Sequence, residues 1–157
     1  MLAISLGYPL GADNKSFLVQ YNKKIHRLSF EEAAVWMGFN GIKHIEALNS
    51  DVYIFEELVR RGLIVKAASE YELFTKIQSS IPLRQGAGST VDSKMAIFLG
   101  ETVTAPTHTQ YMLWLQCNGS NTVYDIFSYL GRALNSNLSE LLTTLNCLDE
   151  KDLLYLV

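Results

Sequence analysis

The residues that could do chemistry in this sequence are three histidines and two pairs of adjacent glutamates. His26, His44 and His108 fall in different predicted elements, and no two of them have the short spacing that places two imidazoles on one metal ion. The glutamate pairs, at positions 31–32 and 56–57, lie in predicted helices. Consecutive helical side chains do not face each other, so these pairs are poor candidates for a shared acid–base site. The pattern predicts surface positions rather than catalytic or metal-binding ones.

The remaining candidates for chemistry also lack the spacing they need. The glycine-rich stretch GAGS, residues 86–89, has no Gly-x-x-x-x-Gly-Lys-Ser/Thr pattern and predicts a linker rather than a phosphate-binding loop. Cys117 and Cys147 have no His or Cys at ligand spacing, and we expect both to be reduced residues of the core. The sequence therefore predicts a protein that is not an enzyme and carries no cofactor or metal.

The amino-acid composition indicates which class of protein this is. Hydrophobic residues make up 48% and charged residues 18%, which is enough apolar material for a packed core. The net charge of -3 gives no strong field that would favour nucleic acid or a membrane surface. The start, MLAISLGYPLGA, lacks the basic and long apolar regions of a signal peptide, and no stretch reaches the ~20 apolar residues that span a bilayer. We expect a soluble, cytoplasmic protein.

A repeated hexad gives the first indication of the architecture. WMGFNG starts at Trp36 and WLQCNG at Trp114, so the two are 114 − 36 = 78 positions apart. The same shift places Ser-x-x-Glu at 29–32 on Thr-x-x-Gln at 107–110, and both patterns are capping boxes that begin a helix. The Asn-Gly at 40–41 and at 118–119 predicts a left-handed end for each helix. Both tryptophans fall on the apolar face, where we expect them to anchor a core.

The elements around the hexads repeat in the same order. Turns at 22–23 and 100–101 separate SFLVQY from KIHRL and MAIFL from TVTA, so each predicts a β-hairpin. A second apolar stripe begins at Ile45 and Leu48 in one copy and at Val123 and Ile126 in the other. The predicted third helix carries an apolar face at Val52, Phe55, Leu58 and Val59, and in the second copy at Leu138, Leu141, Leu142, Leu145 and Leu148. GLIVKA and DLLYLV predict closing strands. This common order predicts a duplication.

With TVYDIFSYL at 122–130 and FEELVRRGLI at 55–64, the chain resembles the PqqD-like branch of winged-helix proteins. TVYDI carries the match in the second copy and LVRRGLI carries it in the first. The resemblance implies an α+β fold of tandem duplicated winged-helix-like units, each a β-hairpin with three helices and a short closing strand. We place the first unit at 1–78 with a connector helix near 69–79 capped by Ser69, a linker at 79–93, and the second unit at 94–157.

The resemblance also implies a function. Members of that family are non-catalytic and bind a peptide as an added strand beside the hairpin, against the third helix, and present it to a modifying enzyme. In this chain the implied site consists of the basic hairpin strand and one helix face, namely Lys23, Lys24, Ile25, His26, Arg27, Val52, Phe55 and Val59. Its positive charge favours an acidic protein or peptide partner. Lysines on an edge strand also discourage aggregation, and that alternative explains the same cluster.

Other winged helices insert the third helix into DNA, so a transcriptional regulator is the first alternative. Arg60 and Arg61 would then contact phosphate, although arginines in the last turn of a helix also complement its dipole. From residue 95 onwards, two basic residues face six acidic ones, which disfavours DNA there. A purely structural partner subunit is the second alternative, and homodimer formation is left open.

Overall fold

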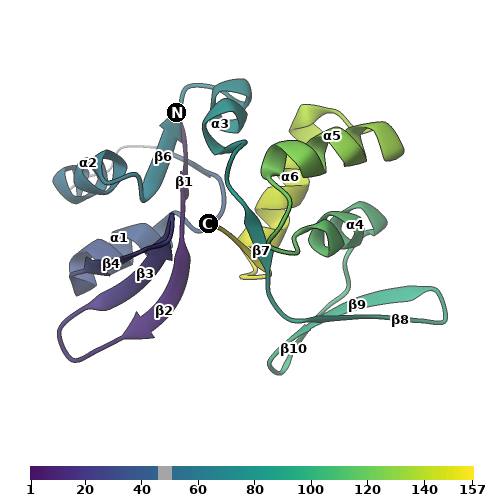
Figure 1. Cartoon of the computed structure of the whole chain (residues 1–157), viewed down its shortest axis with the longest axis horizontal. Helices are drawn as coiled ribbons and strands as arrows, with labels where there is room; N and C mark the ends of the chain where they lie inside the picture. Colours follow the sequence, from purple (N-terminus) through teal and green to yellow (C-terminus); the bar gives the residue numbers. More distant parts are fainter. Residues whose placement is uncertain (46–50) are drawn as a thin grey trace. The chain divides into compact units, whose positions relative to one another are not determined.

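The computed structural model of the chain describes residues 1–45 and 51–157, and for Val91 the backbone only. Within these residues the protein is of the α+β class, with six helices and several small antiparallel sheets (Figure 1). It divides into two compact units, one of residues 1–77 with 156–157 and one of residues 78–155. In the described part of the chain, no helix is long and apolar enough to cross a membrane.

The first unit is built from two small sheets and three helices in its described part. In chain order its elements are β1 (Leu2–Ser5), β2 (Tyr8–Ala12), β3 (Phe17–Tyr21), β4 (Lys24–Leu28), α1 (Phe30–Gly38), β5 (Lys43–His44), α2 (Val52–Arg60), β6 (Ile64–Ala67) and α3 (Glu70–Ile77). The strands pair in the orders β2-β3-β4 and β5-β1-β6. Strand β1 lies in the middle of its sheet, and all of its residues are buried.

Strands β3 and β4 form the hairpin that the sequence predicts. Asn22 and Lys23 connect them with left-handed backbone angles, φ 48° and 61°, in the two-residue turn that matches the twist of antiparallel strands. The register runs from Tyr21 opposite Lys24 to residue 17 opposite residue 28. Because β4 pairs only with β3, it forms one edge of the sheet.

Helix α1 begins at the predicted capping box. The Ser29 hydroxyl accepts a hydrogen bond from the Glu32 backbone N–H at 3.1 Å, and the Glu32 carboxylate accepts one from the Ser29 N–H at 2.8 Å. The helix ends at Gly38, two residues before the Asn-Gly that we expected to close it, and the left-handed Gly41 (φ 79°) lies in the following loop. The connector helix α3 begins after Ser69, whose hydroxyl accepts from residue 72, as predicted.

The core of the first unit surrounds Trp36, which is 4% exposed. Its indole Nε1 donates to the Leu6 carbonyl oxygen at 3.0 Å, so the ring connects α1 to the chain just after β1. Phe39 packs on Phe55 of α2 with ring centroids 5.0 Å apart. The predicted role of Trp36 as a core anchor is confirmed.

The second unit carries three further helices. Its elements are β7 (Pro82–Arg84), β8 (Ala87–Val91), β9 (Lys94–Leu99), β10 (Thr102–Thr104), α4 (His108–Gln116), α5 (Val123–Ala133), α6 (Leu138–Asp149) and β11 (Leu154–Leu156), whose last residue is grouped with the first unit. The strands pair in the orders β10-β9-β8 and β11-β7. Capping boxes begin all three helices, at 107–110 as predicted and also at 122–125 and 137–140.

Most of the predicted core residues of the second unit are also buried, but Leu138 of the predicted helix face is half-buried. Trp114 is 2% exposed, and its Nε1 donates to the Gln85 carbonyl oxygen at 3.0 Å. Four leucines of α6, namely Leu141, Leu142, Leu145 and Leu148, form the predicted apolar face. Both cysteines are free; Cys117 is buried and Cys147 is half-buried. Burial raises the pKa of the Cys117 thiol to about 12, which keeps it protonated.

The prediction of a flexible linker at 79–93 is wrong where this segment forms β7 and β8. Its small residues serve close packing instead of flexibility. A Cβ atom on Gly88 would lie 2.6 Å from Trp114 Cζ3 and 2.8 Å from the Tyr111 hydroxyl oxygen, so only glycine lets β8 approach these rings. Composition alone does not distinguish such a strand from a loop.

The predicted helices of the first unit need two corrections. Ile45 follows β5 and is not helical, while Leu48, the next residue of the expected second stripe, lies outside the described residues. Val52 was expected on the buried face of the next helix, but it is the first residue of α2 and 48% exposed. Phe55 and Leu58 of the same face are buried as expected.

Replacing Trp36 with Ala is expected to lower the free energy of unfolding of the first unit by about 3–5 kcal/mol, because a buried ring and its hydrogen bond are lost. Urea denaturation followed by far-ultraviolet circular dichroism measures this. Each unit holds one of the two tryptophans, so after Trp36→Ala the emission of Trp114 reports the unfolding of the second unit alone and serves as the control. Loss of stability of equal size in both units after Trp36→Ala would contradict the prediction.

Candidate functional site

The open edge of β4 presents the backbone of only two residues. In a two-residue hairpin the flanking residues, here Tyr21 and Lys24, exchange both backbone hydrogen bonds, and bonded and non-bonded pairs then alternate along the ladder. Ile25 and Arg27 fall opposite residues 20 and 18 in the non-bonded positions. Their N–H and C=O groups therefore point away from β3, where an added strand would pair with them.

The side chains along this edge combine positive charge with one large apolar group. Lys23 and Lys24 are exposed at the hairpin turn, and neither forms an ion pair with any described residue. Ile25 is 63% exposed and lies on the solvent face of the strand. His26 is half-buried on the opposite face. The residues at 23–27 thus follow one another along the β4 edge, with Ile25 and Arg27 on its solvent face and Lys24 and His26 on the opposite face.

Asp13 of the β2–β3 loop holds Arg27 in place. Its Oδ1 accepts from the backbone N–H groups of Lys15 (2.8 Å) and Ser16 (2.7 Å), and its Oδ2 accepts from Arg27 Nη1 at 2.9 Å. The hydrogen bonds from the two backbone N–H groups, then the one from the Ser16 hydroxyl at 3.1 Å, and last the one from Arg27 lower the pKa of Asp13 from 3.8 to about 2. The Arg27 side chain is therefore part of a fixed local network rather than a free cation.

Arg61, the residue after α2, reaches the same edge from the other side. Its Nη2 donates to the Arg27 carbonyl oxygen at 3.0 Å, and its Nη1 donates to Glu32 Oε1 at 3.0 Å. The ion pair is largely shielded, with side-chain exposures of 22% and 23%. This contact agrees with the outward direction of the Arg27 carbonyl derived from the hairpin register.

The predicted residues of α2 do not form a groove beside this edge. Phe55 is 2% exposed and packs against Phe39, so it lines no open surface. Val59 packs against the core, and Val52 lies at the opposite end of α2 from Arg61, about 13 Å along the helix axis at ~1.5 Å per residue. The side chain that reaches the open edge of β4 is that of Arg61, the residue after α2.

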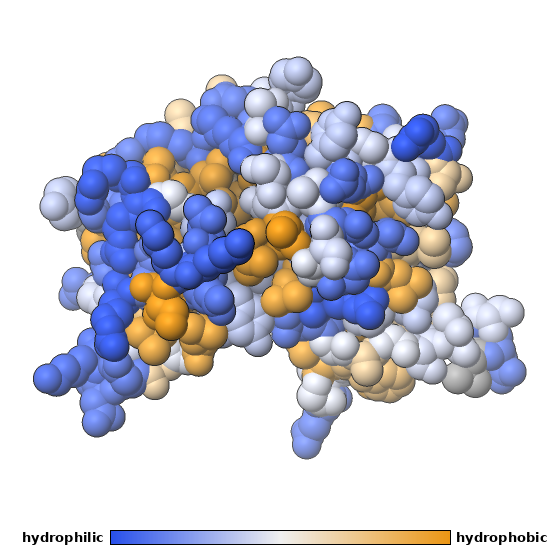
Figure 2. Space-filling model, in the orientation of Figure 1, coloured by the Kyte–Doolittle hydropathy of each residue, from blue (hydrophilic) through white to orange (hydrophobic). Residues whose placement is uncertain are grey.

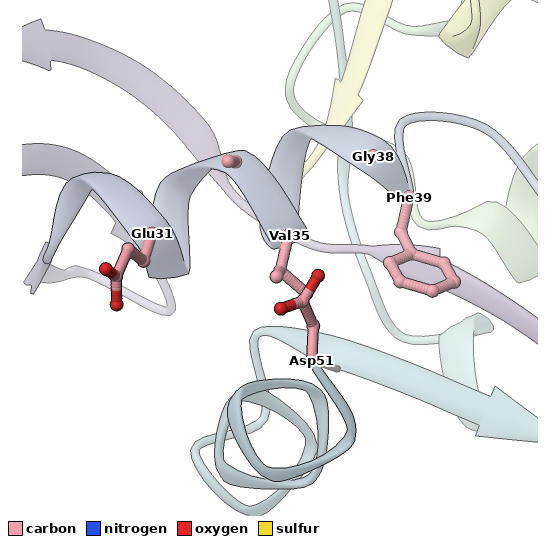
Figure 3. A pocket seen from close by; sticks show the side chains of 6 residues that line it. Glu31, Val35, Gly38, Phe39 and Asp51 are labelled. Atoms are coloured by element: carbon pink, nitrogen blue, oxygen red, sulfur yellow. The ribbon is translucent and has the colours of Figure 1, made fainter. Parts of the chain in front are cut away.

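A hollow does exist between α1 and the start of α2, and none of the residues that line it belongs to β4 (Figure 3). Its lining residues are Glu31, Ala34, Val35, Gly38, Phe39 and Asp51. In Figure 3 the Asp51 side chain rises towards Val35 of α1. Since Asp51 directly follows residues 46–50, which are not described, we assign no ligand to this hollow.

The hydrophobic surface elsewhere is broken into separate patches by hydrophilic residues on the face seen in Figure 2. The most exposed large hydrophobic residues include Tyr53 (82%), Tyr71 (73%), Ile25 (63%) and Val103 (61%). Val103 occupies on β10 the position that Ile25 occupies on β4, because Gly100 and Glu101 form a two-residue turn and Val103 pairs with Phe98. The β10 edge carries no charged residue and runs into Pro106.

The remaining candidates are dispersed. His44 is exposed on β5 of the first unit, and His108 is exposed at the start of α4 in the second. Arg60, a predicted DNA contact, binds Glu57 through two hydrogen bonds of 2.8 and 2.6 Å, and this pairing raises the pKa of Arg60. Among the described residues, no three His, Cys, Asp or Glu side chains gather as metal ligands would.

Four residues of this site escaped the sequence analysis as contributors to the edge: Asp13, Ser16, Glu32 and Arg61. A signal existed for Asp13, since Asp-x-x-Ser is typical of a tight turn capped by a side chain. The pairing of Glu32 with Arg61 joins residues 29 positions apart and has no local sequence signal.

The chain matches no protein-family model, no curated protein and no solved structure, so these comparisons assign it no family.

Asp13→Asn is expected to lower the thermal stability of the first unit at neutral pH. The folded pKa of Asp13 is depressed, so its stabilising effect is complete above the unfolded value of 3.8 and is lost as the pH falls towards about 2. The difference in melting temperature between wild type and variant should therefore narrow below about pH 4. Circular dichroism melts between neutral pH and pH 2 measure it, and a difference that stays constant would contradict the assignment.

Proposed function

We propose that the protein is a non-catalytic adaptor whose first unit binds an acidic, extended peptide as a strand added to β4. The observation that carries this proposal is the open edge at Ile25, where an outward-facing N–H and C=O adjoin an exposed apolar side chain and two lysines without partners among the described residues. Backbone pairing supplies affinity in this mode, and alternate side chains supply specificity.

The charge and the exposed isoleucine define the peptide that fits. Side chains of an added strand lie beside those of β4 on the same faces of the sheet. A peptide residue next to Ile25 is then apolar, and one near Lys23 or Lys24 is acidic, since opposite charges on neighbouring strands stabilise the pair. An acidic peptide also associates faster with a basic edge. The partner class is therefore an acidic peptide segment, free or within a larger protein.

We further infer that the two units are tandem copies of one winged-helix-like fold. Corresponding contacts within each unit support this. Ser5 N–H donates to the residue 39 carbonyl at 2.9 Å, and Arg84 N–H donates to that of residue 117 at 2.8 Å. Leu6 N–H donates to residue 63 at 2.9 Å, and Gln85 N–H donates to residue 153 at 2.8 Å. Each tryptophan indole binds the carbonyl of Leu6 or Gln85, and a left-handed glycine follows in both units.

If the units are copies, their hairpin edges differ in charge. The β4 edge is basic, whereas the matching β10 edge holds Thr102, Val103 and Thr104 and is followed closely by Pro106, which cannot donate a backbone hydrogen bond. This difference supports peptide binding by the first unit alone. It also makes β10 an internal control for any experiment on β4.

The two arginines proposed to contact DNA are engaged within the first unit. Arg60 is paired with Glu57, and Arg61 binds Glu32 and the edge of β4. Using either one for phosphate would break an existing ion pair, so the arrangement favours peptide over duplex binding. Nitrocellulose-filter binding of random duplex DNA at low and moderate salt tests the DNA-binding alternative. A chain that binds phosphate retains DNA on the filter, and this retention falls steeply as the salt concentration rises.

Ile25→Pro is expected to abolish measurable peptide binding or weaken it by at least about tenfold. Proline removes the outward N–H of residue 25 and leaves the β3–β4 ladder intact, since that N–H does not bond to β3. The probe is a displayed library of short random peptides, followed by fluorescence anisotropy of the enriched sequences. Val103→Pro makes the matched change on β10 and should bind as wild type does. Equal affinities of the wild type and Ile25→Pro for the enriched peptides would contradict the proposal.

Charge reversal tests the same edge by a different route. Lys24→Glu should weaken the binding of the enriched acidic peptides several-fold and reduce its dependence on salt concentration. Lys94→Glu alters net charge equally on an exposed residue of the second unit and should leave binding unchanged. Edge protection without binding predicts the opposite pattern: no peptides are enriched, and Lys24→Glu alters only solubility.

A further inference from the structure

Strand β8 forms an open edge of the sheet β10-β9-β8 in the second unit (Figure 1). A two-residue turn at 92–93, with left-handed φ angles of 51° and 64°, connects it to β9. The flanking residues, Val91 and Lys94, therefore exchange both backbone hydrogen bonds, and bonded and non-bonded pairs alternate from there along the ladder. Gly88 and Thr90 fall in the non-bonded positions. Their N–H and C=O groups point away from β9, towards the open edge.

The corresponding strand of the first unit, β2, is blocked where β8 is open. Gln20 does not bond to β4, so its N–H and C=O groups pair with Tyr8 of β2. The next residue, Pro9, then takes the outward position that Gly88 takes in β8, and it offers no N–H. A bulge between Pro9 and Gly11 interrupts the ladder further along. The edge of β2 is therefore a poor template for another strand.

The β8 edge lacks the features that oppose strand pairing at the other edges of the two hairpin sheets. Lysines flank the β4 edge, and β10 has three residues and runs closely into Pro106. Residues 87–90 of β8, Ala-Gly-Ser-Thr, include no proline and no charged residue, and their pairing with β9 is regular. An edge of this kind is a template for a further strand.

We propose that β8 pairs with β8 of a second copy of this chain, antiparallel about a two-fold axis at Ser89. The axis places Gly88 opposite Thr90 of the second copy, and Thr90 opposite its Gly88. Since the backbone groups of both residues point outwards, each of these two pairs exchanges both of its hydrogen bonds across the contact. The hairpin sheets of the two copies then join into one continuous sheet. This contact belongs to the second unit and does not depend on peptide binding at β4.

The side chains of β8 fit a second copy of the same strand. Ser89 meets its own copy in a non-bonded pair, where Cα atoms approach to about 4.5 Å and side chains come closest. A small side chain fits there, and two hydroxyl groups can hydrogen-bond to each other. Thr90 of the second copy lies beside Gly88, which has no side chain of its own.

The lack of charge along β8 favours a second copy over a charged peptide. No like charges face each other across the axis, because residues 87–90 carry none. An acidic or basic strand would gain no ion pair on this edge, in contrast to the edge of β4 with Lys23 and Lys24. A self-complementary edge about a two-fold axis also gives a closed dimer rather than an open chain of copies.

Thr90→Pro is expected to weaken self-association at least about tenfold. Proline removes the outward N–H of residue 90 in both copies, and thus half of the hydrogen bonds of the contact, while the β8–β9 ladder keeps its own. Sedimentation velocity of the full chain over a range of concentrations measures this, and the wild type should pass from the mass of one chain to that of two. Val103→Pro makes the same change at the outward position of β10 and should leave self-association unchanged.

Opposite charges placed on the axis test the symmetry of the contact. Ser89→Lys and Ser89→Glu should each stay monomeric, because like charges would face each other directly. An equal mixture of the two variants should form a dimer of one copy of each, since a lysine and a glutamate are then opposite. Thr102→Lys and Thr102→Glu on β10 are the matched controls and should associate as the wild type does.

Each outcome supports or overturns the pairing of β8. A wild-type chain that stays monomeric up to millimolar concentration overturns it, and so does a dimer that is unaffected by Thr90→Pro. If Thr90→Pro is unfolded by circular dichroism, the mixture of the two Ser89 variants decides instead, and the absence of a mixed dimer overturns the inference.

The displayed peptide library separates this contact from the proposed function. A monomeric wild type that binds peptides, and loses them in Thr90→Pro but not in Ile25→Pro, assigns β8 to a foreign strand and overturns self-pairing. Peptides lost only in Ile25→Pro support the β4 site and leave the dimer to be judged by sedimentation. The two proposals can therefore fail separately, because the two variants alter different units.

Discussion

The two-residue turn at Asn22 and Lys23 is the constraint on which the candidate site depends. A turn of this kind makes Tyr21 and Lys24 a bonded pair, and the strict alternation of antiparallel pairing then directs the backbone groups of Ile25 and Arg27 outwards. One residue more in the turn would exchange the open and bonded positions and reverse the two faces of the strand. The exposed isoleucine, the lysines and the open carbonyl all follow from this register.

Around that register, hydrogen bonds within the first unit hold the β4 edge. Arg27 donates to Asp13, Arg61 donates to the Arg27 carbonyl and to Glu32, and Glu32 accepts from the backbone N–H of Ser29 at the start of α1. In the proposed strand addition, a surface held in this way would lose little freedom, which lowers the entropic cost of association. The same bonds determine which outward backbone group of β4 already has a partner within the unit, namely the Arg27 carbonyl.

The second unit shows which parts of the arrangement belong to the fold and which belong to the site. In both units a tryptophan indole donates to a backbone carbonyl of the segment that connects two strands. In both, the helix that carries this tryptophan begins with a capping box. The β4 edge is charged, and Arg61 contacts its backbone, while the β10 edge is uncharged. The shared features stabilise each unit, and the charged edge is additional to them.

Local patterns in the sequence were sufficient to predict most of the helices and strands. Capping boxes, hairpin turns and apolar faces depend on residues within a few positions of one another, so the starts of α1 and α4, the β3–β4 hairpin and the buried tryptophans could be predicted. The prediction failed at β8, where Gly88 is required by the approach of Trp114 and Tyr111, because small residues in a close-packed strand have the composition of a loop. It also failed at Val52, whose exposure depends on how α2 packs.

The sequence by itself determined that this chain carries a basic hairpin strand and no recognisable catalytic pattern, since both are properties of residue type and short spacing. The hairpin turn sets which backbone groups of that strand face outwards, and only the tertiary structure decided that one of them, the Arg27 carbonyl, already accepts a hydrogen bond. Arg61 and Glu32 are 29 positions apart, and their meeting at the Arg27 carbonyl depends on the packing of α2 against α1. The residues that form the strand are neighbours in the sequence. Whether a backbone group at its edge is free depends also on residues that are distant in the sequence, because these can supply its hydrogen-bond partner.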